Sequence, residues 1–267
     1  MLKQTFLHLQ GIGEATERRI WREGMRTWEE FCRNSSHTGL CARIRGLAAV
    51  GVEESMARFD RGDWRFFDNR LPSPHKWRAF GELRERALYV DIETLGLDPL
   101  SDRITVIGAF DGGRVHSFVA GRNMDDAADL LSAHPLWVTF NGSVFDVPMI
   151  RRNLAGLREN RVHIDLRFAL KPLGFSGGLK AIERAFGIER TARTQGLDGW
   201  DAVRLWREHL SGRSESLETL LEYNAEDVRN LKPLMEFAYA KLSARTCFNE
   251  NQGRPTAGPG GATWPDP

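Results

Sequence analysis

The sequence predicts an α/β fold in which a mixed five-stranded sheet is flanked by helices, and three observations support this prediction. From residue 88 onward, short runs of β-branched and other apolar residues alternate with helical patterns. The first three runs have no helical pattern between them, and Asp111-Gly112-Gly113 supplies a hairpin turn, so these strands should be antiparallel. The later runs are separated by helical patterns, so their strands should be parallel.

The elements can be placed by residue number. Strands are expected within 87–96 and at 104–110, 115–119, 136–140 and 162–166. Helices are expected at 124–133, 147–154, 179–186, 200–210 and 215–242, where apolar residues recur at helical spacing. In the second of these helices, Pro148 is tolerated only in the first turn.

The pattern divides the chain into three parts and indicates a soluble protein. Residues 1–82 should form a small helical domain, 83–246 the α/β domain, and 247–267 a disordered tail rich in Gly and Pro. A net charge of +1 indicates neither a nucleic-acid nor a membrane partner, and no apolar run approaches the length of a membrane span. Three scattered cysteines without a CxxC pair fit a reducing compartment. We therefore expect a cytoplasmic protein with no membrane partner.

Near the N-terminus, Gly11-Ile12-Gly13 precedes a helical pattern. This turn resembles the helix-hairpin-helix motif, in which backbone N–H groups of a glycine turn contact a nucleic-acid phosphate. Glycine permits close backbone approach and a helix N-terminus favours an anion, so Gly11 and Gly13 are candidate substrate contacts. A tight turn in an ordinary helical domain accounts for the same residues.

The rest of the helical region carries two further signals. Thr27 and Glu30 have the spacing of a capping box at the start of a helix. Aromatic residues lie among basic residues between 64 and 80 and could stack on bases. We favour core positions for these aromatic residues, which are Trp64, Phe66, Phe67, Trp77 and Phe80.

Two acids stand at the end of the first predicted strand. Side chains alternate faces along a strand, so Asp91 and Glu93 should point the same way while Ile92 points to the other face. Two neighbouring carboxylates repel each other unless a cation lies between them. The pair therefore indicates a divalent metal site that would take further acids from later in the sequence.

Two later segments could supply those acids. Asp146 lies at the start of a helix, shortly after Asn141 and the end of a strand, where a structural N-cap carboxylate is equally common. Tyr223 and Asp227 are four residues apart on the last helix and share one face, which an apolar stripe can pack onto the sheet. Taken singly, each of these sites fits a structural role.

Taken together and in this order, the motifs resemble those of the DEDD 3′-5′ exonucleases of the ribonuclease-H-like superfamily, in the subgroup with a Tyr in the last motif. The motifs are Asp-x-Glu on a first strand, Asn-x-x-x-Phe-Asp after a later strand, and Tyr-x-x-x-Asp on a late helix. The chain is also similar to the YprB-type ribonuclease-H-like proteins. This second likeness rests on the Gly-Ile-Gly segment, Tyr-Val-Asp-Ile-Glu-Thr, His163-Ile164-Asp165-Leu166, Leu179-Lys180, and the stretch from Asp198-Gly199-Trp200 to Asp227.

The resemblance implies a ribonuclease-H-like fold and two-metal-ion hydrolysis of phosphodiester bonds. It implies that two Mg²⁺ or Mn²⁺ ions are held by Asp91, Glu93, Asp146 and Asp227. Tyr223 would orient the attacking water, and because an ordinary tyrosine is protonated at neutral pH it would act by hydrogen bonding. The terminal nucleotide of a single-stranded 3′ end, DNA or RNA, would contact Asn141, Thr94 and Leu95.

Other residues leave alternatives open. Lys180 begins a helix after Gly177-Gly178 and is a candidate phosphate contact. Ten Lys or Arg against four Asp or Glu between residues 151 and 193 could line a channel for a phosphate backbone or form a solvated face. Asp165 could be a fifth metal-site acid or a strand-end residue bonded to backbone.

Three other functions compete with the exonuclease. The same chemistry would serve a structure-selective endonuclease, and a non-catalytic nucleic-acid-binding protein could keep the fold, although none of the four acids is missing. Residues 174–178 match the Gly-x-Ser-x-Gly pattern of serine hydrolases, but that pattern needs a strand directly before it, and Lys171-Pro172 interrupts the approach.

Overall fold

The computed structural model describes residues 1–34, 39–96 and 103–246, and the predicted disordered tail at 247–267 lies outside these ranges. One sheet is built from β1 (Ala87–Thr94), β2 (Ile104–Phe110), β3 (Val115–Val119), β4 (Leu136–Thr139) and β5 (Val162–Asp165). The strand order is β3-β2-β1-β4-β5, with β1–β2 and β2–β3 antiparallel and β1–β4 and β4–β5 parallel. The predicted mixed five-stranded α/β fold is confirmed.

The predicted helices of this region are present. They are α6 (Ala127–Ala133), preceded by the 3₁₀ turn η5 (Met124–Asp126), and α7 (Asp146–Asn153), α9 (Leu179–Ala185), α10 (Gly199–Leu210) and α11 (Ser214–Arg245). A short helix α8 (Leu166–Leu170) and a 3₁₀ turn η6 (Lys171–Leu173) were not predicted. The strand predicted at 162–166 ends at Asp165, because this carboxylate caps α8 by accepting a hydrogen bond from the Arg167 N–H.

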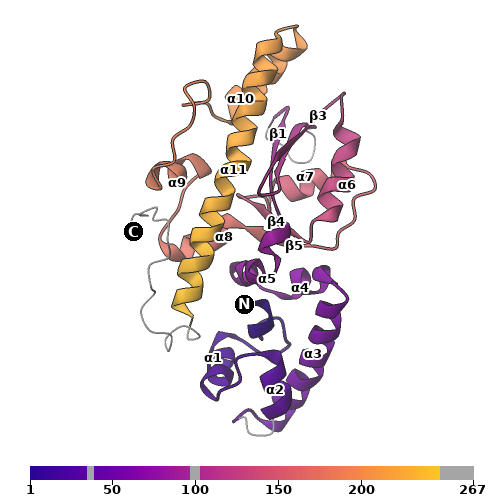
Figure 1. The fold of residues 1–267 in the computed structure, drawn as a ribbon, viewed down its shortest axis with the longest axis vertical. Helices are drawn as coiled ribbons and strands as arrows, with labels where there is room; N and C mark the ends of the chain where they lie inside the picture. The colour runs from indigo at the N-terminus through magenta and orange to yellow at the C-terminus, as the bar shows by residue number, and fades with distance from the viewer. Residues whose placement is uncertain (35–38, 97–102, 247–267) are drawn as a thin grey trace.

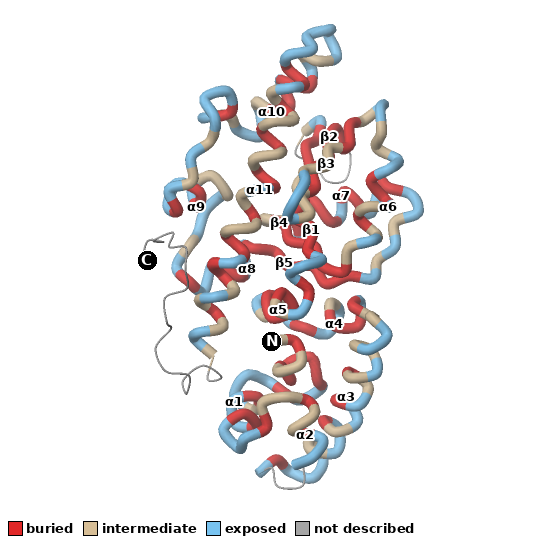
Figure 2. Tube along the Cα trace, viewed as in Figure 1, coloured by how far each residue is buried: buried red, intermediate tan, exposed pale blue. Residues whose placement is uncertain are grey.

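The two faces of the sheet are covered by different helices (Figure 1). On β1, Leu88, Val90 and Ile92 pack with residues of α6 and α7 in one apolar cluster. Tyr89 belongs to another cluster, which contains Leu231 and further residues of α11. Figure 2 shows buried residues along the strands and the central part of α11. Because side chains alternate along a strand, Asp91 and Glu93 share the α11 side with Tyr89.

A glycine on β2 lets α11 approach the sheet closely. Gly108 pairs with Asp91 in the antiparallel ladder. A Cβ atom at Gly108 would lie 1.9 Å from Oδ1 of Asn224 and 3.2 Å from Cγ1 of Val228, both on α11. Only a residue without a side chain fits here, and the contact brings α11 against the acidic end of β1.

The N-terminal region is helical, as predicted. Its elements are η1 (Leu2–Gln4), α1 (Glu14–Arg22), α2 (Trp28–Asn34), α3 (Ala42–Asp60), α4 (Trp64–Arg70), η3 (Ser73–Ala79), α5 (Phe80–Leu83) and η4 (Arg84–Arg86). The aromatic residues between 64 and 80 are buried, which confirms their predicted core positions. The apolar cluster that contains them continues into the sheet through Tyr89 and Val138. The boundary predicted at residue 82 stays a prediction.

The N-terminal motifs have different outcomes. Glu30 accepts a hydrogen bond from the Thr27 N–H (3.0 Å) while the Thr27 hydroxyl accepts one from the Glu30 N–H (3.2 Å), so the capping box is confirmed. Gly11 has a φ of +80° and α1 begins at Glu14, but the regular element before this turn is the three-residue η1. The helix-hairpin-helix likeness stays a prediction. No helix within the described ranges combines the length and the apolar character needed to cross a membrane.

Candidate active site

Three carboxylates meet where β1 faces α11. One carboxylate oxygen each from Asp91, Glu93 and Asp227 lie within 4.8 Å of one another. Glu93 and Asp227 are buried, and Asp91 is partly exposed. The strand periodicity aims the first two at α11, and the apolar stripe of α11 turns Asp227 toward the sheet. The structure thus brings together three of the four predicted metal ligands.

Asn224 links the acids and was not singled out from the sequence. Its Nδ2 donates to Oδ2 of Asp91 (2.9 Å) and to Oε1 of Glu93 (3.4 Å), and the side chain is fully buried. Asn224 lies three residues before Asp227 and therefore on the same helix face. This three-residue spacing from Asp227, inside the Tyr-x-x-x-Asp motif, is the sequence signal that could have identified Asn224.

The electrostatics of the cluster favour a divalent cation. Burial, together with the neighbouring Asp227, raises the pKa of Glu93 to about 8, and burial and the surrounding carboxylates raise the pKa of Asp91 well above its ordinary value. Burial also raises the pKa of Asp227 to about 6, against the opposing effect of Arg190. Each shift expresses the cost of burying negative charges together. Hard carboxylate oxygens in this arrangement fit Mg²⁺ or Mn²⁺.

Asp146 lies beside this group rather than inside it. It is the first residue of α7, is buried, and lines a cavity of about 440 Å³ with Asp91 and Asn141. Burial and the nearby Asp165 raise the pKa of Asp146 to about 8. A Cβ atom on Gly142 would lie 2.7 Å from Oδ2 of Asp146, so the glycine makes room for this carboxylate. Its role as a metal ligand stays a prediction.

Asp165 holds the loop that carries Asn141. The Asp165 carboxylate accepts hydrogen bonds from the backbone N–H groups of Asn141 (2.8 Å), Ser143 (3.1 Å) and Arg167 (3.0 Å). Asn141 adopts a left-handed conformation with φ of +63°, and its Oδ1 accepts a 2.6 Å bond from Nη1 of Arg167. These contacts favour the backbone-bonded interpretation of Asp165 over a fifth metal ligand.

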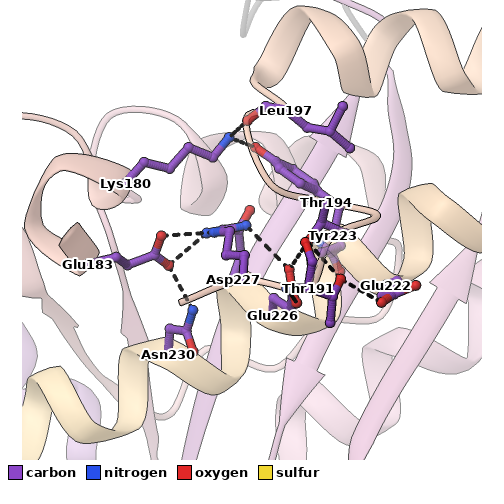
Figure 3. A network of polar contacts seen from close by, with 12 residues as sticks. Lys180, Glu183, Thr191, Thr194, Leu197, Glu222, Tyr223, Glu226, Asp227 and Asn230 are labelled. Atoms are coloured by element: carbon purple, nitrogen blue, oxygen red, sulfur yellow. Dashed lines mark hydrogen bonds and ion pairs between the residues drawn. The ribbon is translucent and has the colours of Figure 1, made fainter. Parts of the chain in front are cut away.

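Tyr223 reaches the site with a cationic partner. Lys180 donates from Nζ to the Tyr223 hydroxyl and to the Leu197 carbonyl (Figure 3). Burial and the acids Asp227 and Glu93 raise the pKa of Tyr223, so the phenol keeps its proton at neutral pH. Lys180 lies in the first turn of α9, as the glycines before it predicted.

Arg190 enters the site from the segment between α9 and α10, and it was missed by sequence reasoning. It forms an ion pair with Asp227 and a two-point contact with the buried Glu183, at 2.6 and 2.9 Å. Glu183 also accepts a 2.9 Å bond from Asn230 of α11 (Figure 3). No signal could have found Arg190, because its partners become neighbours only when α9 and α11 pack together.

The remaining predicted substrate contacts lie in two places, at the end of β1 and before α1. Thr94 and Leu95 are at the end of β1, where the Thr94 hydroxyl donates to the Gly96 carbonyl and the Leu95 side chain is 36% exposed. Gly11 and Gly13 precede α1, which lies at the opposite end of the molecule from α10 (Figure 1).

Two alternatives lose support. The Gly-x-Ser-x-Gly segment at 174–178 follows the 3₁₀ turn η6 rather than a strand, so it lacks the geometry of a serine nucleophile. Part of the basic surplus at 151–193 already has partners. Arg161 is buried with its guanidinium 3.5 Å from the ring centroid of Trp137, Arg190 is buried in the site, and the half-exposed Arg151 pairs with Glu159.

The fold and the acidic cluster define an α/β protein of ribonuclease-H-like architecture. A family model described as the RNase_H superfamily matches residues 88–239, more than half of the chain, so the chain belongs to this superfamily. No curated protein matches the sequence.

Similar solved structures include two of NrnC from Brucella melitensis, both 20% identical. The form with bound Mg²⁺ covers 65% of this chain and 80% of that one with a TM-score of 0.44, and the form bound to pGG covers 62% and 83% with a TM-score of 0.41. A third, described as the apo form of a nuclease, is 22% identical and covers 62% and 77% with a TM-score of 0.42.

Proposed function

We propose that this protein is a metal-dependent nuclease that hydrolyses phosphodiester bonds of nucleic acid, acting as a 3′-5′ exonuclease with two Mg²⁺ or Mn²⁺ ions. The observation that carries the proposal is the convergence of Asp91, Glu93 and Asp227 within 4.8 Å, with Tyr223 one helical turn before Asp227. Membership of the RNase_H superfamily is consistent with this chemistry.

Each residue has a defined role in the proposal. Asp91, Glu93 and Asp227 would hold metal. Asp146, which lines the cavity with Asp91, would be the fourth metal ligand. The bound ions would activate a water and stabilise the leaving oxygen. Tyr223 would donate its phenolic proton in a hydrogen bond to the attacking water, because its raised pKa keeps that proton in place.

The substrate contacts follow from the edges of the site. Asn141 lines the cavity, and the exposed Leu95 follows β1 beside Thr94, so these residues would contact the terminal nucleotide. Lys180 already donates to Tyr223 and would place a positive charge near the phosphate.

An exposed aromatic residue supports a single-stranded substrate. Trp200 is 63% exposed at the start of α10, three residues after the Leu197 carbonyl that binds Lys180. It lines a shallow cavity of about 350 Å³ with Arg204 and Arg207. Among the described residues, Arg207 makes no ion pair. An exposed ring beside a free guanidinium suits an unpaired base and its phosphate.

The test uses single strands labelled at the 5′ end, with EDTA followed by Mn²⁺ add-back. A ladder that shortens stepwise from the 3′ end supports the exonuclease. A single internal cut would favour the structure-selective endonuclease, and binding without cleavage would favour a non-catalytic nucleic-acid-binding protein. A parallel panel of DNA, RNA and duplex substrates defines the substrate class.

A further inference from the structure

Arg190 joins the acidic cluster to a second buried carboxylate. Its Nη2 donates to Asp227 and to Oε1 of Glu183, and its Nε donates to Oε2 of Glu183 at 2.9 Å. The side chains of Glu183, Arg190 and Asp227 are 3%, 7% and 8% exposed. The guanidinium is therefore a buried charge paired with two carboxylates rather than a solvated surface cation.

The same guanidinium has unused hydrogen-bonding capacity. Nη1 of Arg190 is buried and makes no hydrogen bond with any residue that the structure describes, and Oε2 of Glu226 lies 3.9 Å from it. A buried N–H group without an acceptor is unfavourable. Phosphate oxygens match the planar guanidinium in charge and in geometry, so an anionic phosphate would satisfy this donor.

The backbone beside Arg190 is anchored to α11. The Thr191 N–H donates to Glu226 (2.9 Å), and the Thr191 hydroxyl donates to Glu222 (2.8 Å). The Thr194 hydroxyl also donates to Glu226 (Figure 3). Arg190 can therefore exchange one partner for another by rotating its side chain while the surrounding segment stays in place.

We propose that Arg190 binds the substrate phosphate and that it holds Asp227 until the phosphate arrives, so that complete metal binding is coupled to substrate binding. This inference rests on the proposed function. In the free protein Arg190 bonds to a carboxylate needed for metal, and its positive charge opposes a second divalent ion. Once a phosphate accepts the hydrogen bonds of the Arg190 guanidinium, Asp227 is free to bind metal. Coupling free energies are reciprocal, so phosphate and metal must raise each other's affinity by the same factor.

Calorimetric titration of Mn²⁺ into the full chain, with and without adenosine 5′-monophosphate, tests the coupling. The wild type should bind a first Mn²⁺ tightly and a second weakly, and the nucleotide should tighten the second by about fivefold to a hundredfold. The Glu183→Gln/Arg190→Gln double variant removes Arg190 together with Glu183, so Glu183 is not left as an unpaired buried charge and Asp227 is released for metal. It should bind the second Mn²⁺ more tightly than the wild type and gain nothing from the nucleotide.

Two further variants keep the test decisive. Arg193→Gln is the matched control, because Arg193 lies on the same segment and forms surface ion pairs with Glu218 and Glu222. It should behave as the wild type. If the double variant does not fold, Arg190→Lys keeps the charge but loses the planar fork, so the nucleotide effect should fall while metal affinity without nucleotide stays low.

An unchanged second Mn²⁺ affinity together with an unchanged nucleotide effect in the folded Arg190 variants would overturn the inference alone. The proposed function would instead be contradicted if the wild-type chain binds no Mn²⁺, or if the Asp91→Asn variant binds Mn²⁺ as the wild type does.

Discussion

Asn224 on α11 lies directly against Gly108 on β2, so that a methyl group on Gly108 would come within 1.9 Å of Oδ1 of Asn224. The same Asn224 donates to Asp91 and Glu93 through Nδ2. Close packing of helix on sheet and the positions of two of the three clustered acids therefore depend on one contact.

Gly108→Ala should displace Asn224 and lower both stability and activity. Overpacking of a buried contact costs about 1–3 kcal/mol in the free energy of unfolding. Urea denaturation and cleavage rates measure the two effects. Gly113→Ala is the matched control, because its Cβ would meet its nearest neighbour, Oδ1 of Asp111, at an ordinary 3.6 Å. Equal stability and equal activity of the two variants would refute the role of the contact.

Much of the fold could be predicted because the information is local. β-Branched runs identify the strands, and the two-residue period of a strand places Asp91 and Glu93 on one face. The four-residue spacing of Tyr223 and Asp227 places both on one face of α11.

The parts that were missed depend on contacts between distant segments. Arg190 meets Asp227 across 37 residues, and Asn224 meets Asp91 across 133 residues. The local periodicity of a sequence does not indicate contacts between residues so far apart. The sequence alone allows two interpretations of Asp165, because only the folded loop after β4 brings its backbone N–H groups to the carboxylate.

Divalent metal should stabilise the protein. Relief of repulsion among buried carboxylates makes Mn²⁺ a ligand of the native state, and a ligand at about 100 times its Kd contributes about 2.7 kcal/mol. Differential scanning calorimetry should show a rise of several degrees in Tm with millimolar Mn²⁺ over EDTA. Asp227→Asn should reduce this rise. No change in the wild-type Tm would contradict a metal site.

Acid should destabilise the N-terminal region through His8. His8 Nε2 bonds to Ser55 Oγ at 2.8 Å, and the Ser55 hydroxyl donates to the Gly51 carbonyl. Within the described part of the chain, His8 Nδ1 has no hydrogen-bond partner. Burial, with the positive charge of Arg70, lowers the pKa of His8 to about 3.

The unfolded chain therefore binds more protons than the folded chain between pH 3 and the ordinary histidine pKa of about 6.5, so stability falls as pH drops below that value. The loss between pH 7 and 5 should be about 2 kcal/mol from His8. His8→Leu cannot titrate, so its urea-unfolding free energy should fall less over this range than that of the wild type. His163, buried with a pKa of about 4, contributes equally to both proteins. Identical pH dependence in the two proteins would refute the assignment.

Trp200 should contribute to substrate binding and not to folding. Loss of one base–aromatic stack costs about 1–3 kcal/mol, so Trp200→Ala should raise KM for single-stranded oligonucleotides about tenfold and leave Tm unchanged. Leu210→Ala, at the other end of α10 and equally exposed at 66%, is the control. Equal KM values for the two variants would remove Trp200 from the proposed substrate path.

The most direct test of the acidic cluster is the cleavage of a 5′-labelled single strand by Asp91→Asn and Tyr223→Phe proteins in Mn²⁺. Asp91 lies in the three-carboxylate group, whereas Tyr223, which accepts a hydrogen bond from Lys180, is proposed to orient water. Asp91→Asn should abolish cleavage while its circular dichroism spectrum matches the wild type. Tyr223→Phe should slow cleavage and keep most of the Mn²⁺ affinity. Full activity in a pure, well-folded Asp91→Asn protein would contradict the proposed site.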